Sequence, residues 1–185
     1  MLQKSSPEPG KKHPITFHIL QKIWPIVQTM KDSLCIKAAL AFFRGLHGSE
    51  YLKTKFMAGP KLSQLTICSK SRITYTVMRS KTQPKGFTLP YHCSCDTVCP
   101  VCCTLEYLSH RRSTDRPRQS ACLFIENGVE LTKDRFNYII KQAMATAGYN
   151  HNHFTTHSLR SGVTTTAACN NFSDWELKKT RGMGN

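Results

Sequence analysis

The stretch TTHSLRSGVTTTAA, Thr155 to Ala168, decides how the rest of the chain is interpreted. His157 and Arg160 stand three residues apart at the start of a helical segment, and residues at that spacing are neighbours on one helix face. A histidine and an arginine on one face can contact the same small anion. The stretch therefore indicates a position that binds a phosphate.

The charge of the whole chain favours a partner that carries phosphates. Its 185 residues contain 26 Lys and Arg against 11 Asp and Glu, which gives a formal charge of +15. An excess of this size attracts nucleic acid or an anionic membrane surface. No apolar stretch is long enough to cross a bilayer, and the N-terminus lacks the apolar core of a signal peptide. We therefore expect a soluble, intracellular protein whose partner is not a membrane.

The hydrophobic pattern predicts one α+β domain. Alternating and β-branched runs predict a small antiparallel sheet over 61–68, 72–79 and 86–90. Helices are predicted on both sides of it, over 17–30 with an interruption near Pro25, and over 33–46, 99–112, 131–147 behind a Thr132 cap, 157–169 and 173–180. Residues 1–14 are polar and are expected to be a linker or a disordered end, so the domain covers residues 15–185.

Several segments, in order, resemble the catalytic domain of the tyrosine recombinases, also called phage integrases. TTHSLRSGVTTTAA is similar to their His-x-x-Arg box, in the form found in eukaryotic mobile elements such as DIRS-type retrotransposons and Cryptons. The other segments are PITFHIL (14–20), AALAFFRGLHGSEYL (38–52), VMRSKTQPKG (77–86) and LKKTRGMGN (177–185). They resemble the start of the domain, its first-arginine helix, its lysine hairpin and its Gly-Arg-Trp segment. The resemblance implies a mainly helical fold with a small antiparallel sheet, duplex DNA as partner and a nuclear location.

The resemblance also implies a reaction and the residues that carry it. These enzymes cut a DNA strand with a tyrosine, form a 3′-phosphotyrosyl link and rejoin the end to another strand, without a metal. By position, Arg160 would clamp the phosphate oxygens and His157 would donate to the same phosphate or transfer a proton. Lys81 would protonate the leaving 5′-oxygen. Glu50 would lie near the first-arginine position, and the implied DNA-binding residues are Arg44, Lys85, Lys178, Lys179 and Arg181.

Two departures from the family pattern bear on activity. His47 occupies the place of the first arginine, and an imidazole is shorter, has no fork and is mostly neutral at pH 7, since its ordinary pKa is about 6.5. The family's tyrosine nucleophile lies beyond the Gly-Arg-Trp segment, whereas the six tyrosines of this chain all precede the box. We therefore expect a recombinase domain truncated before its nucleophile, inactive as it stands. The alternative is a non-enzymatic DNA-binding remnant or domesticated protein, and a homo-oligomer on DNA stays open.

Nine cysteines raise the question of a metal. Cys93, Cys95, Cys99 and Cys102, with His92, are candidate zinc ligands, and Cys99-x-x-Cys102 has a usual ligand spacing. No second Cys-x-x-Cys or His pair follows at finger spacing, and the family resemblance provides a Cys-Pro-Val helix start without a metal. We therefore expect no cofactor. A zinc-stabilised interaction module stays open as a third interpretation.

Overall fold

The structure is a computed structural model, and it describes residues 12–31, 33–41, 46, 48–78, 84–114, 122–126 and 128–169. These residues form the helices α1 (Phe17–Gln28), α2 (Ser33–Ala41), α3 (Gly48–Tyr51), α4 (Pro100–Thr114), α5 (Lys133–Thr146) and α6 (Thr156–Cys169). The strands are β1 (Leu65–Ser69), β2 (Arg72–Val77), β3 (Phe87–His92), β4 (Ile125–Glu126) and β5 (Val129–Glu130), and two 3-10 turns are η1 (Leu62–Gln64) and η2 (His151–His153). The fold is α+β, as the sequence predicted.

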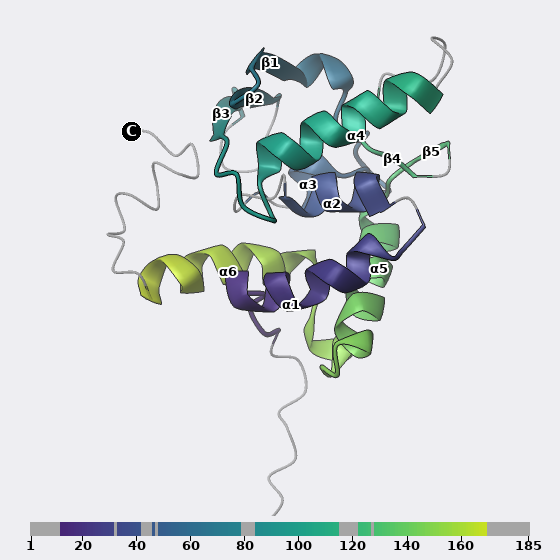
Figure 1. The fold of residues 1–185 in the computed structure, drawn as a ribbon, viewed down its shortest axis with the longest axis vertical. Coiled ribbons are helices and arrows are strands. Elements are labelled where there is room, and N and C mark those ends of the chain that lie inside the picture. The colour runs from purple at the N-terminus through teal and green to yellow at the C-terminus, as the bar shows by residue number, and fades with distance from the viewer. Residues whose placement is uncertain are drawn as a thin grey trace, which may run out of the picture.

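The elements form two layers (Figure 1). One layer contains the three-stranded sheet and α4, the other contains α1, α5 and α6, and α2 lies between them in contact with both α4 and α1. The core fills this interior because each element turns its apolar side inward. Trp24 of α1, Ile36 of α2, Tyr75 of β2 and Phe136 of α5 are each at most 1% exposed.

The sheet is an antiparallel meander in the order β1-β2-β3. Strand β2 alternates between buried and more exposed residues, with Ile73, Tyr75 and Val77 facing the core, so one face of the sheet is covered. The predicted strand at 61–68 begins later than expected, because the Lys61 N–H donates to Gln64 Oε1 (2.7 Å) and holds 61–64 in a 3-10 turn. The Gln64 amide then donates to the Thr76 carbonyl (2.8 Å), which fixes that turn to β2.

Helix α1 is continuous, which corrects the predicted interruption near Pro25. Proline removes the N–H that would bond to the carbonyl four residues earlier, here that of Gln21. Both Pro25 and Gln21 are exposed, so water can bond to that carbonyl and the helix continues at low cost. The helix starts behind Thr16, whose side chain accepts the Ile19 N–H (3.4 Å).

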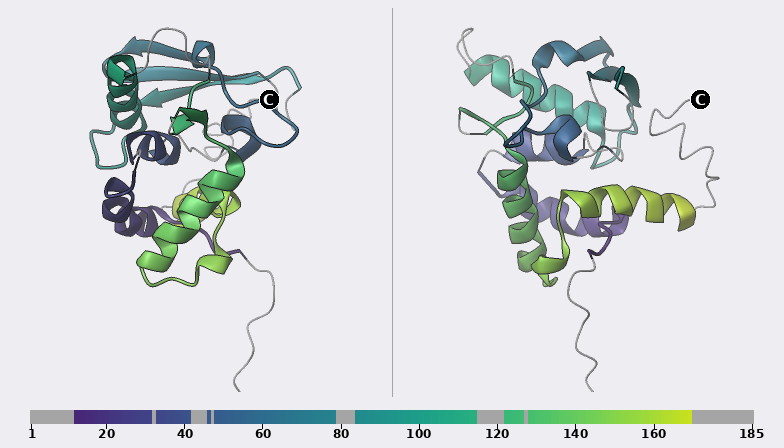
Figure 2. Two further views of the ribbon diagram at one scale, coloured as in Figure 1. Left: turned by 90° about the vertical axis from the view of Figure 1, so that its right-hand side faces the viewer. Right: turned by 180° about the vertical axis from the view of Figure 1, so that it is seen from behind.

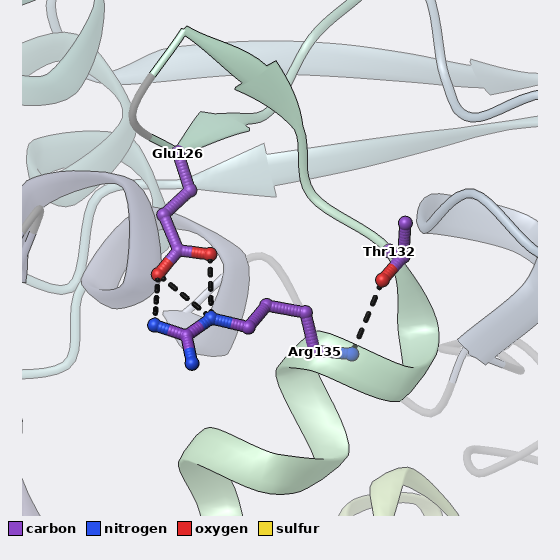
Figure 3. Close-up of polar contacts among 3 residues, drawn as sticks. All are labelled: Glu126, Thr132 and Arg135. Atoms are coloured by element: carbon purple, nitrogen blue, oxygen red, sulfur yellow. Dashed lines mark hydrogen bonds and ion pairs between the residues drawn. The ribbon is translucent and has the colours of Figure 1, made fainter.

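The start of α5 is fixed by two polar interactions (Figure 3). Thr132 Oγ1 accepts the Arg135 N–H at 3.1 Å, which confirms the predicted cap. The Arg135 side chain forms a forked pair with the carboxylate of Glu126, with Nη2 2.7 Å from Oε1 and Nε 2.9 Å from Oε2. Since Glu126 lies in the short β4–β5 hairpin, the pair joins that hairpin to the helix.

Helix α6 lies against the extended segment that leads into α1. The Ile15 N–H donates to the Ser158 carbonyl at 2.8 Å, and Gly162 has no side chain at the point where the Ile15 carbonyl approaches. The later turns of α6 project beyond α1 in both the front and the back view (Figures 1 and 2). Because only one side of α6 packs against the domain, residues 163–166 are half-buried.

Most other predicted elements are present. The predicted helices 33–46, 99–112, 131–147 and 157–169 correspond to α2, α4, α5 and α6, although α2 is described only to residue 41. The predicted helix 173–180 lies outside the described residues. Helix α3 and the β4–β5 hairpin were not predicted, because each is too short to show a period. Among the described residues, no helix combines the length and the apolar character needed to cross a membrane.

Candidate functional site

Helix α6 begins in a network of hydrogen bonds. The Thr156 N–H donates to Asn137 Oδ1 (2.8 Å) and the His157 N–H donates to Thr155 Oγ1 (3.2 Å). Thr155 N–H in turn donates to Ser158 Oγ (3.1 Å). Because these bonds satisfy the first N–H groups, an anion at this helix end would be held chiefly by side chains and by the helix dipole.

His157 and Arg160 lie one helical turn apart in α6, as the spacing predicted. His157 is exposed and Arg160 is half-buried, so the imidazole is open to a ligand. Arg160 and His157 are both donors when charged, and Arg160 is a permanent forked donor. Their spacing on α6 would allow both side chains to reach one phosphate, which is the basis of the proposal below.

The start of α3 meets the start of α6. A Cβ placed on Gly48 would lie 3.0 Å from Thr156 Oγ1 and 3.3 Å from Lys133 Cε, so these elements are closely packed and a larger residue would have to displace these side chains slightly. Gly48 begins α3, Lys133 begins α5 and Thr156 begins α6. The N-terminal ends of three helices thus converge, and the positive ends of the dipoles of the two long helices, α5 and α6, favour an anion there.

Glu50 lies two residues further along α3, beside the sheet. Its backbone carbonyl accepts the Tyr75 hydroxyl at 2.7 Å, and burial, followed by the negative charge of Glu50, raises the pKa of Tyr75 above its ordinary value. The Glu50 side chain also lines a cavity of about 410 Å³ between α3, the segment 57–64 and the end of β2. These contacts tie α3 to the strand that leads into the predicted lysine hairpin.

The remaining predicted DNA-binding residues are mostly outside the described part of the chain. Lys85 is described and is exposed in the turn before β3. His47, Lys81, Arg44, Lys178, Lys179 and Arg181 lie outside the described residues, although Leu46, Gly48, Met78 and Pro84 bracket His47 and Lys81. The structure thus brings Gly48, next to His47, against the box, and it leaves the geometry of the six residues themselves undescribed.

Three acidic side chains form ion pairs with basic side chains. Glu106 pairs with Lys37 (3.3 Å), Glu130 with Lys53 (3.1 Å) and Glu126 with Arg135 (2.7 Å). With 26 basic against 11 acidic residues in the chain, such pairs leave most of the positive charge uncompensated. The excess is therefore available to a polyanion.

The cysteine cluster is assembled where β3 ends and α4 begins. The sulfurs of Cys93, Cys99 and Cys102 all lie within 4.8 Å of one another, and they are the metal-capable group among the described residues. Cys95 Sγ lies 3.0 Å from Cys93 Sγ. Burial raises the pKa of Cys99, but hydrogen bonds from the backbone and the side chains of Cys102 and Ser94 outweigh it and lower this pKa to about 6. These residues are the ones that could hold a metal.

Two residues of the site were not identified from the sequence. Asn137 in α5 accepts the first N–H of α6, and Lys133 lies against Gly48. Neither stands in a motif, since each acts through a contact between helices far apart in the sequence. The sequence signal for Asn137 is its position next to Phe136 and three residues before Ile140, which places this polar residue near the buried face of α5.

No protein-family model and no curated protein matches the sequence. Among solved structures, the chain is similar to the XerH site-specific recombinase bound to its difH substrate in a pre-cleavage complex, with a TM-score of 0.64 and 17% identity over 91% of this chain. It is also similar to XerH in a post-cleavage complex with palindromic difH, with a TM-score of 0.62 and 18% identity over 95% of this chain. The chain spans about half of the XerH chain (47% and 48%). The fold is therefore that of a tyrosine recombinase catalytic domain.

Proposed function

We propose that this chain is a DNA-binding domain of the tyrosine recombinase type, which holds a backbone phosphate of duplex DNA at the start of α6. The observation that carries the proposal is the contact of Gly48 with Thr156 and Lys133. Through it, the residue after His47 lies against the residue before His157, at the converging N-terminal ends of α5 and α6. The Arg160 guanidinium, the His157 imidazole and the helix dipoles would together stabilise the negative charge of a phosphodiester.

The finer assignment rests on the resemblance of the sequence segments. It assigns the chain to the recombinases of eukaryotic mobile elements, with a nuclear location and an ancestral reaction of DNA cleavage and rejoining during integration. Arg160, His157, Lys81 and Glu50 take the roles that the resemblance implies. XerH, with the same fold, was solved on its DNA substrate, which supports duplex DNA as the partner of this chain.

The tyrosines of residues 1–185 favour binding over cleavage. Covalent catalysis requires a phenolic oxygen placed in line behind the phosphorus. Four of the six tyrosines are at most 4% exposed and belong to the core, namely Tyr51, Tyr75, Tyr91 and Tyr107. Tyr138 is exposed but its ring lies under the Arg135 guanidinium, 5.3 Å away. The sixth, Tyr149, is half-buried and packs edge-on against Phe154, with ring centroids 5.9 Å apart. A polypeptide of these residues is therefore expected to bind DNA without forming a phosphotyrosyl link.

The test measures binding to a labelled duplex as a function of salt. The wild-type protein should bind with little sequence preference, and its affinity should fall steeply with added salt as counterions are released. Arg160→Ala should weaken binding on every sequence and reduce the logarithmic salt slope by about 0.9, the loss of one phosphate contact. Arg112→Ala is the matched control, because this exposed arginine lies in the last turn of α4, in the layer away from α6.

Two outcomes would contradict the proposal. Binding that does not change with salt would exclude a phosphate interface, and equal effects of Arg160→Ala and Arg112→Ala would exclude α6 as its centre. The same protein incubated with a nicked suicide duplex should give no covalent adduct on a denaturing gel. An adduct would refute the binding-only interpretation, and its loss in Arg160→Ala would locate the active site at α6.

A further inference from the structure

Four cysteines from two elements meet outside the proposed phosphate site. Cys93 follows the last residue of β3, Cys99 immediately precedes α4, and Cys102 lies in the first turn of α4. Their sulfur atoms lie 3.4 Å (Cys93 to Cys102) and 3.6 Å (Cys93 to Cys99) apart, and Cys95 Sγ lies 3.0 Å from Cys93 Sγ. All four are free thiols in this structure.

The distances from Cys93 Sγ to Cys102 Sγ (3.4 Å) and to Cys99 Sγ (3.6 Å) are close to those of a tetrahedral metal site, whereas the 3.0 Å to Cys95 Sγ is shorter. A Zn–S bond of about 2.3 Å implies a separation of about 3.8 Å between two sulfurs of one tetrahedron. A disulfide would need about 2.0 Å, well below the observed distances. Packing does not explain the cluster either, because Cys95 and Cys102 are exposed and gain little from each other's apolar surface.

The local backbone presents the sulfurs in fixed positions. The Val98 N–H donates to Asp96 Oδ1 (3.0 Å) and the Cys99 N–H to the Asp96 carbonyl (3.1 Å), which closes a tight turn before α4. Cys95, the residue before this turn, is in the left-handed conformation (φ 53°). The Cys102 N–H points at Cys99 Sγ (3.5 Å), so the pair Cys99-x-x-Cys102 carries its own N–H···S contact.

We propose that Cys93, Cys95, Cys99 and Cys102 bind one structural Zn²⁺ ion in a tetrahedral S4 site. Cys93, Cys99 and Cys102 already lie within 4.8 Å of one another. Cys95 lies outside that group of three, but its sulfur is 3.0 Å from Cys93 Sγ and would supply the fourth ligand after a small shift. Four thiolates are a donor set that favours zinc, and a closed set of four protein ligands makes a structural site.

The ion would fix the lysine hairpin at its base. Cys93 N–H donates to the Ser71 carbonyl (2.8 Å), so the ligand loop is bonded to the turn between β1 and β2. A zinc ion would therefore join the sheet to the start of α4. Strand β3 runs from this base back to Gly86 and Lys85, so the metal would hold the hairpin register from the end opposite to Lys85.

The test uses the full chain, expressed in cells that are grown with added zinc. The protein is purified under reducing conditions and without a chelator. Elemental analysis should find about one zinc per chain, and replacement by Co²⁺ should give the thiolate charge-transfer and d–d bands of a tetrahedral site. Cys102→Ser should lower the affinity for Co²⁺ at least tenfold. Since Cys102 is exposed, serine fits there without a packing defect, and far-ultraviolet circular dichroism checks that the variant is folded before its metal affinity is compared.

Cys68→Ser is the matched control, because Cys68 is an exposed free cysteine on β1, outside the cluster. It should keep the full metal content and the cobalt spectrum. Equal metal affinity in Cys102→Ser and Cys68→Ser would overturn the proposal. A wild-type protein that is folded, takes up no Co²⁺ when reduced and forms a Cys93–Cys102 disulfide in air would also overturn it, in favour of a redox site.

Discussion

Replacement of Gly162 by alanine tests how α6 is positioned. In an open helix position this change stabilises a protein by about 1 kcal/mol, because alanine is the better helix former. At Gly162 the added Cβ would lie 1.8 Å from the Ile15 carbonyl oxygen and 2.4 Å from its carbon. Both are backbone atoms, so no side chain can rotate away. We therefore expect the opposite sign from helix propensity alone.

The size of the effect follows from the contacts that must open. To reach a tolerable 3.0 Å, the Ile15 segment has to move away from α6 by about 1.2 Å. That shift breaks the 2.8 Å bond from the Ile15 N–H to the Ser158 carbonyl, which is worth about 1 kcal/mol. It also loosens the packing of Ile15, a buried residue, at about 1–3 kcal/mol. After the gain in propensity, the net loss of unfolding free energy is about 1–3 kcal/mol.

Urea unfolding followed by circular dichroism measures this loss. Ser161→Ala, one residue earlier, is the control, since it adds no atom and removes only bonds from Ser161 Oγ to the carbonyls of His157 and Ser158. Its unfolding free energy should change by less than about 0.5 kcal/mol. If Gly162→Ala proved as stable as the wild type, the close approach of α6 to Ile15 would be wrong, and with it the placement of His157 and Arg160.

Two further predictions concern the hairpin and the buried tyrosines. Gly86→Ala and Gly128→Ala both place a side chain at positive φ (73° and 74°), at about 1 kcal/mol each. Only at Gly86 does the Cβ also strike backbone, 2.3 Å from the Val77 carbonyl oxygen, so its melting temperature should fall further than that of Gly128→Ala; equal shifts would contradict the contact. Burial raises the pKa of three tyrosines above their ordinary 10.0, so the unfolded chain releases these protons first and stability should fall as the pH rises above about 10. Absorbance of tyrosinate should rise together with the loss of helicity, and ionisation of a fully helical protein would argue against the burial of Tyr51, Tyr75 and Tyr107.

Periodicity predicted the long elements because they bury one regular side. Helix α5 is an example, since Phe136, Ile140 and Ala143 recur at helical spacing behind the Thr132 cap, and all are buried. Helix α3 has only four residues, GSEY, and shows no period. It forms because Tyr51 is buried in the core and Tyr75 donates to the Glu50 carbonyl, contacts that involve residues far away in the sequence. Such tertiary contacts cannot be predicted from a local pattern.

The candidate site also has a part that a local sequence pattern predicted and a part that depends on tertiary contacts. The spacing of His157 and Arg160 was sufficient to place them on one face of a helix, because three residues make nearly one turn. The partners of that helix were not predictable, since Asn137, Gly48 and Lys133 reach it from three other parts of the chain. For the cysteines, the sequence lacked a second Cys-x-x-Cys pair, and this argued against a metal. The fold replaces the missing pair by bringing Cys93, at the end of β3, to the start of α4.

The buried positions of several tyrosines bear on whether these residues could cleave DNA. A nucleophilic tyrosine must be able to lose its proton at the phosphate, whereas burial raises the pKa of Tyr51, Tyr75 and Tyr107 and holds them protonated. These rings instead fill the core: Tyr51 packs edge-on against Phe136, and the Tyr107 hydroxyl donates to the Leu123 carbonyl at 3.1 Å. The residues proposed to contact a phosphate are instead the permanent cation Arg160 and the exposed His157, both on α6. In the proposed phosphate site, Arg160 and His157 bind the DNA backbone, and the buried rings of Tyr51, Tyr75 and Tyr107 do not supply a nucleophile.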